Sequence, residues 1–186
     1  MERRKIFFGF PIPENVSKRL EEKMGSSISE GLRMTKRRNL HITVLPIGFR
    51  TDEDIVRITE AIRTTCASFE PFELSFDRIA PLPESGKGVR HFLWYTGPES
   101  EELLLFYNRL REALNIHDAP KKHFAPHITL ARIDHEKRRS LQEKSALELS
   151  WSVVISVSGL TLFESVFTKE EGLRYEPLET FPFEAV

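Results

Sequence analysis

The sequence predicts an α+β fold made of two similar lobes. Short β-rich segments alternate with amphipathic helical segments along the 186 residues, and their order repeats once. The hydrophobic share of 40% is enough for a core and excludes wholesale disorder. We expect one domain, 1–186, in which a first lobe near 1–80 and a second near 88–186 are related by a pseudo-twofold axis. Antiparallel-rich sheets should line a central cleft, with helices outside.

In the first lobe, a β-rich run over 5–10 stops at two prolines, which can open a helix. Apolar residues then recur every four positions and predict a helix that ends near Gly25. Thr51 is a plausible N-cap, because three acidic residues follow it in the first turn of the next helix. The remaining elements predicted here are a strand over 40–47, a helix over 52–66 and a strand over 72–76.

The second lobe repeats this order. Its predicted elements are strands over 89–95 and 125–132, a helix over 101–114, a shorter helix over 137–146, and strands over 151–157 and 159–163. The tail over 173–183 is rich in proline and aromatic residues and suggests an edge strand.

A tetrapeptide repeat marks the centre of each lobe. His-Ile-Thr-Val at 41–44 matches His-Ile-Thr-Leu at 127–130, an offset of 127 minus 41, or 86. The same offset superposes Phe7 on Leu93 in strands and Leu20 on Phe106 in helices. Because flanking elements keep the register, chance is a weak explanation and an internal duplication is indicated.

The side chains of the two repeats can take part in acid–base catalysis and in phosphate binding. Side chains alternate along a strand, so His41 and Thr43 share one face, about 7 Å apart along the strand, and His127 and Thr129 share another. A twofold axis would bring the two pairs together. Two histidines that titrate near neutrality can act as general base and general acid. Two threonine hydroxyls can donate to the oxygens of a phosphate held between them.

Composition excludes several classes of protein. A net charge of −1 argues against a uniformly basic nucleic-acid coat, although basic residues cluster next to both repeats. One cysteine, Cys66, rules out a disulfide scaffold and a Cys-rich zinc module and suggests a reducing, cytoplasmic setting. We expect no membrane span, no cofactor and no metal, since two histidine nitrogens alone make a poor zinc site.

The segments Asn39-Leu40-His41-Ile42-Thr43 and Pro126-His127-Ile128-Thr129-Leu130 resemble the two signatures of the 2H phosphoesterase superfamily. More closely, the chain is similar to the RNA 2′,3′-cyclic phosphodiesterases, also called 2′-5′ RNA ligase-like proteins. The resemblance implies metal-independent hydrolysis of a 2′,3′-cyclic phosphate to a 2′-phosphomonoester. It implies that His127 is the base, that His41 is the acid, that Thr43 and Thr129 hold the phosphate, and that Arg132 helps to bind substrate.

The first motif departs from the family at Pro46, where an aromatic residue that can stack on a base is usual. The base preference is therefore open, and another aromatic residue could take that role. Two alternatives to hydrolysis are also open: an RNA ligase or nuclease acting on 2′-5′ linkages at the same site, and a non-catalytic nucleotide-binding module. The expected partners are nucleotides or RNA ends with a 2′,3′-cyclic phosphate, tRNA fragments among them, and a monomer is expected.

Overall fold

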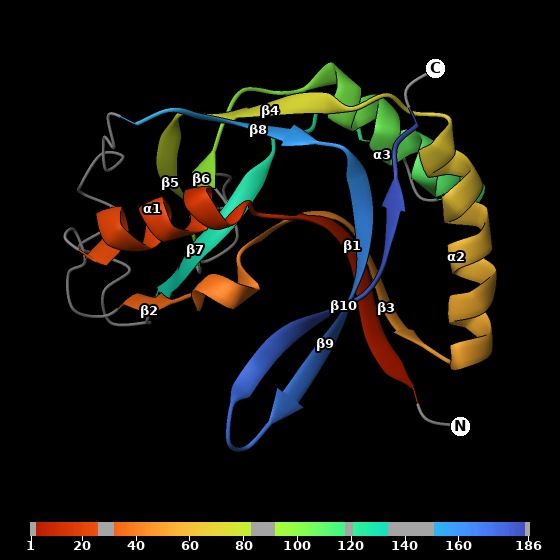
Figure 1. The fold of residues 1–186 in the computed structure, drawn as a ribbon, viewed down its shortest axis with the longest axis horizontal. Helices are drawn as coiled ribbons and strands as arrows, with labels where there is room; N and C mark the ends of the chain where they lie inside the picture. The colour runs from red at the N-terminus through yellow and green to blue at the C-terminus, as the bar shows by residue number, and fades with distance from the viewer. Residues whose placement is uncertain (1–2, 26–31, 83–91, 118–120, 134–150, 185–186) are drawn as a thin grey trace.

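The computed structural model describes residues 3–25, 32–82, 92–117, 121–133 and 151–184 (Figure 1). Its helices are α1 (Glu14–Gly25), α2 (Asp52–Ala67) and α3 (Glu101–Ala113), with a short 3-10 turn, η1 (Arg37–Asn39). Its strands are β1 (Arg4–Pro11), β2 (Leu32–Met34), β3 (His41–Arg50), β4 (Phe72–Phe76), β5 (Arg78–Leu82), β6 (Phe92–Thr96), β7 (His127–Ile133), β8 (Val153–Val157), β9 (Gly159–Thr168) and β10 (Gly172–Pro182). The predicted α+β class is confirmed.

Most of the described strands form one antiparallel sheet. Its order is β10-β9-β1-β3-β7-β6-β5, with β2 added beside β7, and β4 and β8 form a separate pair. The order is symmetric about the junction of β3 and β7, because β1 and β9 follow on one side as β6 and β5 follow on the other. This symmetry is what the repeat in the sequence predicts.

Two β-bulges strengthen the relation between the halves. In β3 the register against β1 shifts at Val44, and in β7 the register against β6 shifts at Leu130, again 86 residues apart. The first six residues of both strands then share one burial pattern: two half-buried motif residues alternate with buried ones, and an exposed residue comes sixth. A bulge re-aims the side chains that follow it. Pro46 and Arg132 therefore return to the face that carries the motif histidines.

The two halves of the sequence exchange strands. β9, from the second half, pairs with β1, whereas β5 and β2, from the first half, pair with β6 and β7. The lobe limits near 80 and 88 stay a prediction, but neither half of the sheet is built from one half of the chain alone. The single domain likewise stays a prediction.

The helices begin where the sequence provides caps. Thr51 forms a capping box with Asp54, and the Ser100 hydroxyl accepts from the Leu103 N–H at the start of α3. The predicted limits of α1, α2 and α3 agree with these helices to within a residue or two. In Figure 1, α2 and α3 lie beside the β3 and β10 side of the molecule, and α1 lies beside β7. Among the described residues, no helix is both long enough and apolar enough to span a bilayer.

Several predicted strand limits differ from the structure: β3 runs on to Arg50, past its predicted end at 47, and β8 begins at Val153 instead of 151. The strand starting at Gly159 runs on to Thr168 and forms a hairpin with β10, which lies at the edge of the sheet over Gly172–Pro182, as predicted for the tail. Pattern reasoning missed β2 and β5, which are short and lack alternation. The predicted helix over 137–146 and the start of the strand over 89–95 lie outside the described residues.

Candidate active site

The four motif side chains lie on one face of two neighbouring strands. Ile42 and Ile128 are paired directly across β3 and β7, and both are fully buried on the helix side of the sheet. Because neighbours in a strand point to opposite faces, His41, Thr43, His127 and Thr129 flank this pair on the other side. We call this surface the motif face. Residues diagonal across an antiparallel pair are about 7–8 Å apart, which is close enough for both imidazoles to reach one phosphate.

A hydrogen bond to a backbone carbonyl fixes the ring of His41. Its Nδ1 lies 2.8 Å from the Asn39 carbonyl oxygen, and its Nε2 lies 2.9 Å from Thr43 Oγ1. A carbonyl oxygen can only accept, so Nδ1 carries a proton and Nε2 faces the Thr43 hydroxyl. Burial lowers the pKa of His41, and the bond to Asn39 opposes that shift.

His127 is held in the corresponding way. Its ring donates to the carbonyl of Ala125, which, like Asn39, precedes the histidine by two residues. Burial is the main cause that lowers the pKa of His127 to about 4, and the charges of Lys121 and His41 lower it further. At neutral pH this ring is therefore uncharged, and its other nitrogen is free to accept a proton. The charge of His41 is the smallest of the causes that lower the pKa of His127.

Different aromatic residues surround the two histidines. Trp94 of β6 stacks on His127 with ring centroids 3.9 Å apart and planes 16° apart. His41 instead lies 4.8 Å from both Phe7 of β1 and Tyr175 of β10 and 6.0 Å from Phe163 of β9. These rings exclude water from the imidazoles and account for the burial that lowers both pKa values.

Asn39 joins the His41 side of the motif face to the C-terminal ribbon. Its side chain donates to the Leu173 carbonyl at 2.9 Å and accepts from the Tyr175 N–H at 3.2 Å, and Asn39 is only 7% exposed. The backbone carbonyl of the same residue orients His41. Ala125, its counterpart in the second half, has no side chain that could do this.

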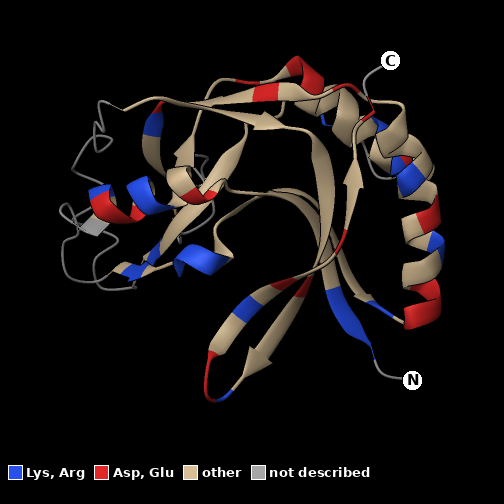
Figure 2. Ribbon diagram, in the orientation of Figure 1, with Lys and Arg blue, Asp and Glu red and all other residues tan. Residues whose placement is uncertain are grey.

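Nearby basic residues serve two different purposes. Arg132 is exposed on the motif face at the position equivalent to Pro46, so one half presents a guanidinium where the other presents a small ring. The basic cluster of η1 is engaged elsewhere: Arg37 pairs with Glu21 of α1, and Arg38 pairs with Glu171 at the ribbon tip. Figure 2 shows this cluster as a blue patch on η1. It adds a general positive field to the region rather than a contact with the motif.

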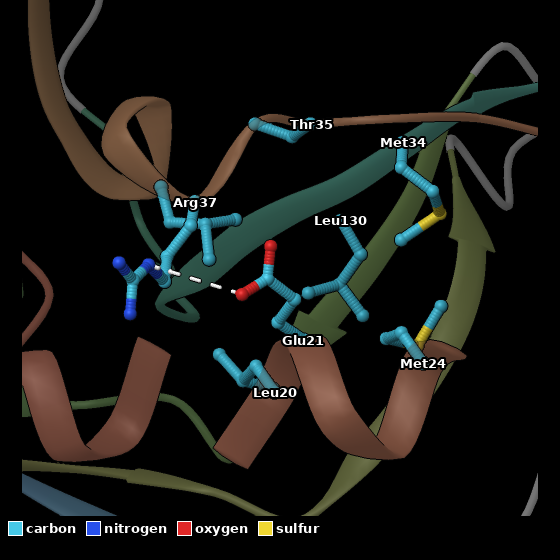
Figure 3. Close-up of a pocket in the computed structure, with 8 residues that line it drawn as sticks. Leu20, Glu21, Met24, Met34, Thr35, Arg37 and Leu130 are labelled. Atoms are coloured by element: carbon cyan, nitrogen blue, oxygen red, sulfur yellow. Dashed lines mark ion pairs between the residues drawn. The ribbon is translucent and has the colours of Figure 1, made fainter. Parts of the chain in front are cut away.

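A separate cavity of about 200 Å³ lies between α1, β2 and β7 (Figure 3). Its lining is mostly apolar, from Leu20, Met24, Met34 and Leu130, and Glu21 and Arg37 face each other across it at 3.8 Å. None of the motif side chains lines this cavity. Among the described residues, no group of three or more His, Cys, Asp and Glu side chains could hold a metal ion. The expectation of a metal-free site stays a prediction.

Sequence reasoning selected the histidines and threonines but missed several neighbours. Trp94 and Tyr175 contact the motif histidines, and Asn39 orients His41; Asn39 stands in the first signature but was given no role, and the other two lie outside both signatures. Phe7 and Trp94 could have been found, because each lies in the strand that precedes its motif strand in the predicted order. Tyr175 gave no signal, since it depends on how the C-terminal strand pairs.

Fold and motif face together define a two-lobed α+β protein in which each lobe contributes one His-x-Thr strand. The sequence profile of the 2′-5′ RNA ligase superfamily matches residues 13–165. This chain belongs to that superfamily, as its motifs indicate.

Two archaeal proteins are similar in sequence, and both are named RNA 2′,3′-cyclic phosphodiesterase. The protein from Archaeoglobus fulgidus is 32% identical over 123 residues, which cover 66% of each chain. The protein from Methanocaldococcus jannaschii is 25% identical over 138 residues, which cover 72% of this chain and 76% of the relative.

Solved structures share the fold. A protein of Thermus thermophilus gives a TM-score of 0.75 at 23% identity and covers 96% of this chain and 97% of its own. Escherichia coli LigT in its apo form gives 0.74 at 22% identity and covers 100% of both chains. At this identity the likeness establishes the architecture.

Proposed function

We propose that this protein hydrolyses the 2′,3′-cyclic phosphate of RNA ends or nucleotides to a 2′-phosphomonoester, without a metal. The observation that carries the proposal is the pair of carbonyl-anchored imidazoles on one face, each next to a threonine of its own strand. The names of the two archaeal relatives support the reaction. The substrates would be nucleotides and RNA ends that carry a 2′,3′-cyclic phosphate, tRNA fragments among them.

In the proposed reaction, His127 removes a proton from water, and the water oxygen bonds to phosphorus. The bond between phosphorus and O3′ breaks, and His41 gives the proton on Nε2 to O3′. The product carries a 2′-phosphate and a 3′-hydroxyl, and the two imidazoles have exchanged protonation states. Thr43 and Thr129 would donate to the phosphate oxygens as charge builds on them, and Arg132 would attract the anion.

Each histidine can be tested on a nucleoside 2′,3′-cyclic phosphate with a chelator present. His41→Ala and His127→Ala should each lower kcat at least about 10²-fold, because each removes one proton transfer. His117→Ala is the matched control, since His117 is an exposed residue beyond α3. Wild-type rates in either motif variant would refute the mechanism, as would loss of activity on chelation. Tight binding without turnover would favour the non-catalytic alternative.

Ligation is the second candidate, and the name of the superfamily favours it. The chemistry at phosphorus is the same, except that the 5′-hydroxyl of another strand replaces water and a 2′-5′ linkage forms. Incubation with tRNA halves that end in a cyclic phosphate distinguishes the reactions. Joined product would support ligation, and release of a 2′-phosphate alone would support hydrolysis.

A further inference from the structure

The ribbon formed by β9 and β10 extends well beyond the rest of the sheet. β9 pairs with β1 through Glu164, but β9 and β10 continue together as far as Thr168 and Gly172. Figure 1 shows this ribbon projecting from the body of the molecule. A projecting ribbon can present side chains next to a site without covering that site.

The ribbon tip exposes a pair of apolar side chains. Phe167 is 72% exposed, Leu173 is 42% exposed, and the two residues are directly paired across the strands. Isolated exposed apolar residues need no explanation. A cross-strand apolar pair at a projecting tip is different, because its exposure to water costs free energy that a ligand covering the pair would recover.

This pair lies on the same face as the surroundings of His41. Side chains two apart share a face of a strand, so Phe163, Ser165 and Phe167 point the same way. Tyr175 is paired with Ser165 and also contacts the His41 ring at 4.8 Å. A band of rings therefore runs from His41 to the tip, and Phe167 lies about 13 Å along the strand from Phe163.

Charge along the ribbon does not oppose a polyanion. Glu171 at the tip is paired with Arg38 at 3.4 Å and with Arg174 at 2.9 Å, and Arg174 also pairs with Glu176 at 2.6 Å. Lys36 donates to the Glu171 carbonyl at 2.7 Å. These contacts neutralise Glu171 and Glu176 and bring the basic η1 cluster next to the tip.

We infer that the ribbon face holding Phe167 and Leu173 is a stacking platform for the single-stranded RNA on the 5′ side of the cyclic phosphate. This inference rests on the proposed function. A cyclic phosphate ends its strand, so the preceding nucleotides must leave the motif face in one direction. Phe163 and Tyr175, which lie beside His41, share the ribbon face of Phe167. Aromatic rings flanked by basic side chains bind single strands with little sequence preference.

The test compares a mononucleotide 2′,3′-cyclic phosphate with a short single-stranded oligoribonucleotide ending in the same group. Phe167→Ala should raise KM for the oligoribonucleotide about 5- to 150-fold, the equivalent of about 1–3 kcal/mol for a stacked base, and leave the mononucleotide unaffected. Phe167→Trp should keep the wild-type KM. Leu105→Ala, which removes an exposed apolar side chain from α3, is the control and should change neither substrate.

Three outcomes would overturn the inference. An unchanged KM for the oligoribonucleotide in Phe167→Ala would show that Phe167 does not stack on the RNA. An equal rise in KM for both substrates would instead place Phe167 in contact with the terminal nucleotide. A dimer in sedimentation that Phe167→Ala dissociates, with unchanged RNA kinetics, would assign the pair to a second copy of the chain. If the wild type does not hydrolyse the mononucleotide, the proposed function fails first, so the two failures are distinguishable.

Discussion

Trp94 lies flat against His127, with ring centroids 3.9 Å apart and planes inclined by 16°. The indole comes from β6, the strand paired with the second motif strand, and covers one face of the imidazole that we propose as the base. Among the described residues, no hydrogen-bond partner reaches the buried indole nitrogen, Trp94 Nε1. The indole therefore acts on His127 through packing and the exclusion of water.

Removing this ring should change the titration of His127. Burial is the main cause of the low pKa, so Trp94→Ala should raise the pKa of His127 from about 4 towards 6.5, as followed by NMR. The loss of a ring pair worth about 0.5–1.5 kcal/mol should also lower kcat about 2- to 12-fold. Trp94→Phe keeps a ring and should stay near wild type. An unchanged pKa of His127 in Trp94→Ala would show that other residues exclude water from the imidazole.

The pH dependence of kcat/KM follows from both histidines in the free enzyme. It should rise as pH increases through about 4, where His127 loses its proton and becomes a base. It should fall as pH increases through the pKa of His41, which burial lowers below 6.5, because the acid is then deprotonated. Patterns in the sequence suggested titration near neutrality, and burial moves both limbs to lower pH.

Binding of substrate should shift both limbs of the pH profile of kcat to higher pH than those of kcat/KM. A phosphate between the imidazoles favours their protonated forms, so both kcat limbs should lie above those of kcat/KM. Stopped assays across the acidic range with a cyclic mononucleotide give both profiles. Coincident limbs for kcat and kcat/KM would contradict close contact between the phosphate and the two rings.

Asn39 should matter to both stability and catalysis. Asn39→Ala leaves the Leu173 carbonyl and the Tyr175 N–H without their side-chain partner and should lower the free energy of unfolding by about 1–3 kcal/mol in urea titrations. It should also lower kcat more than it changes KM for a mononucleotide, since His41 loses a rigid support. Ser17→Ala, which removes a hydroxyl bonded to the Glu14 carbonyl in α1, is the control for stability alone. Parallel behaviour of the two variants would contradict a positioning role.

The motif threonines can be tested with isosteric substitutions. Thr43→Val and Thr129→Val should each lower kcat about 10²-fold or more, because each removes a donor to the reacting phosphate. The loss should be larger at Thr43, whose hydroxyl also contacts His41 Nε2. The serine variants keep the hydroxyl and should retain most activity. Rates for both valine variants close to wild type would assign the threonines to strand packing only.

Signals within the chain were sufficient to predict the main elements and to select the motif residues. Periodicity placed the helices, Thr51 is the N-cap of α2 as predicted, and the repeat at an offset of 86 indicated two equivalent strands. These features are local or repeated, so one chain displays them without any knowledge of long-range contacts. The matching bulges at Val44 and Leu130 are the structural counterpart of that repeat.

The surroundings of each histidine, in contrast, become visible only in the folded molecule. The stacking of Trp94 on His127, the contact of Tyr175 with His41 and the bonds from Asn39 to β10 all join segments far apart in the chain. Strand pairing sets these contacts, and no periodicity encodes which strands become neighbours. The pKa values of the two imidazoles follow from the same contacts, because burial is their largest cause and burial is a property of the folded sheet.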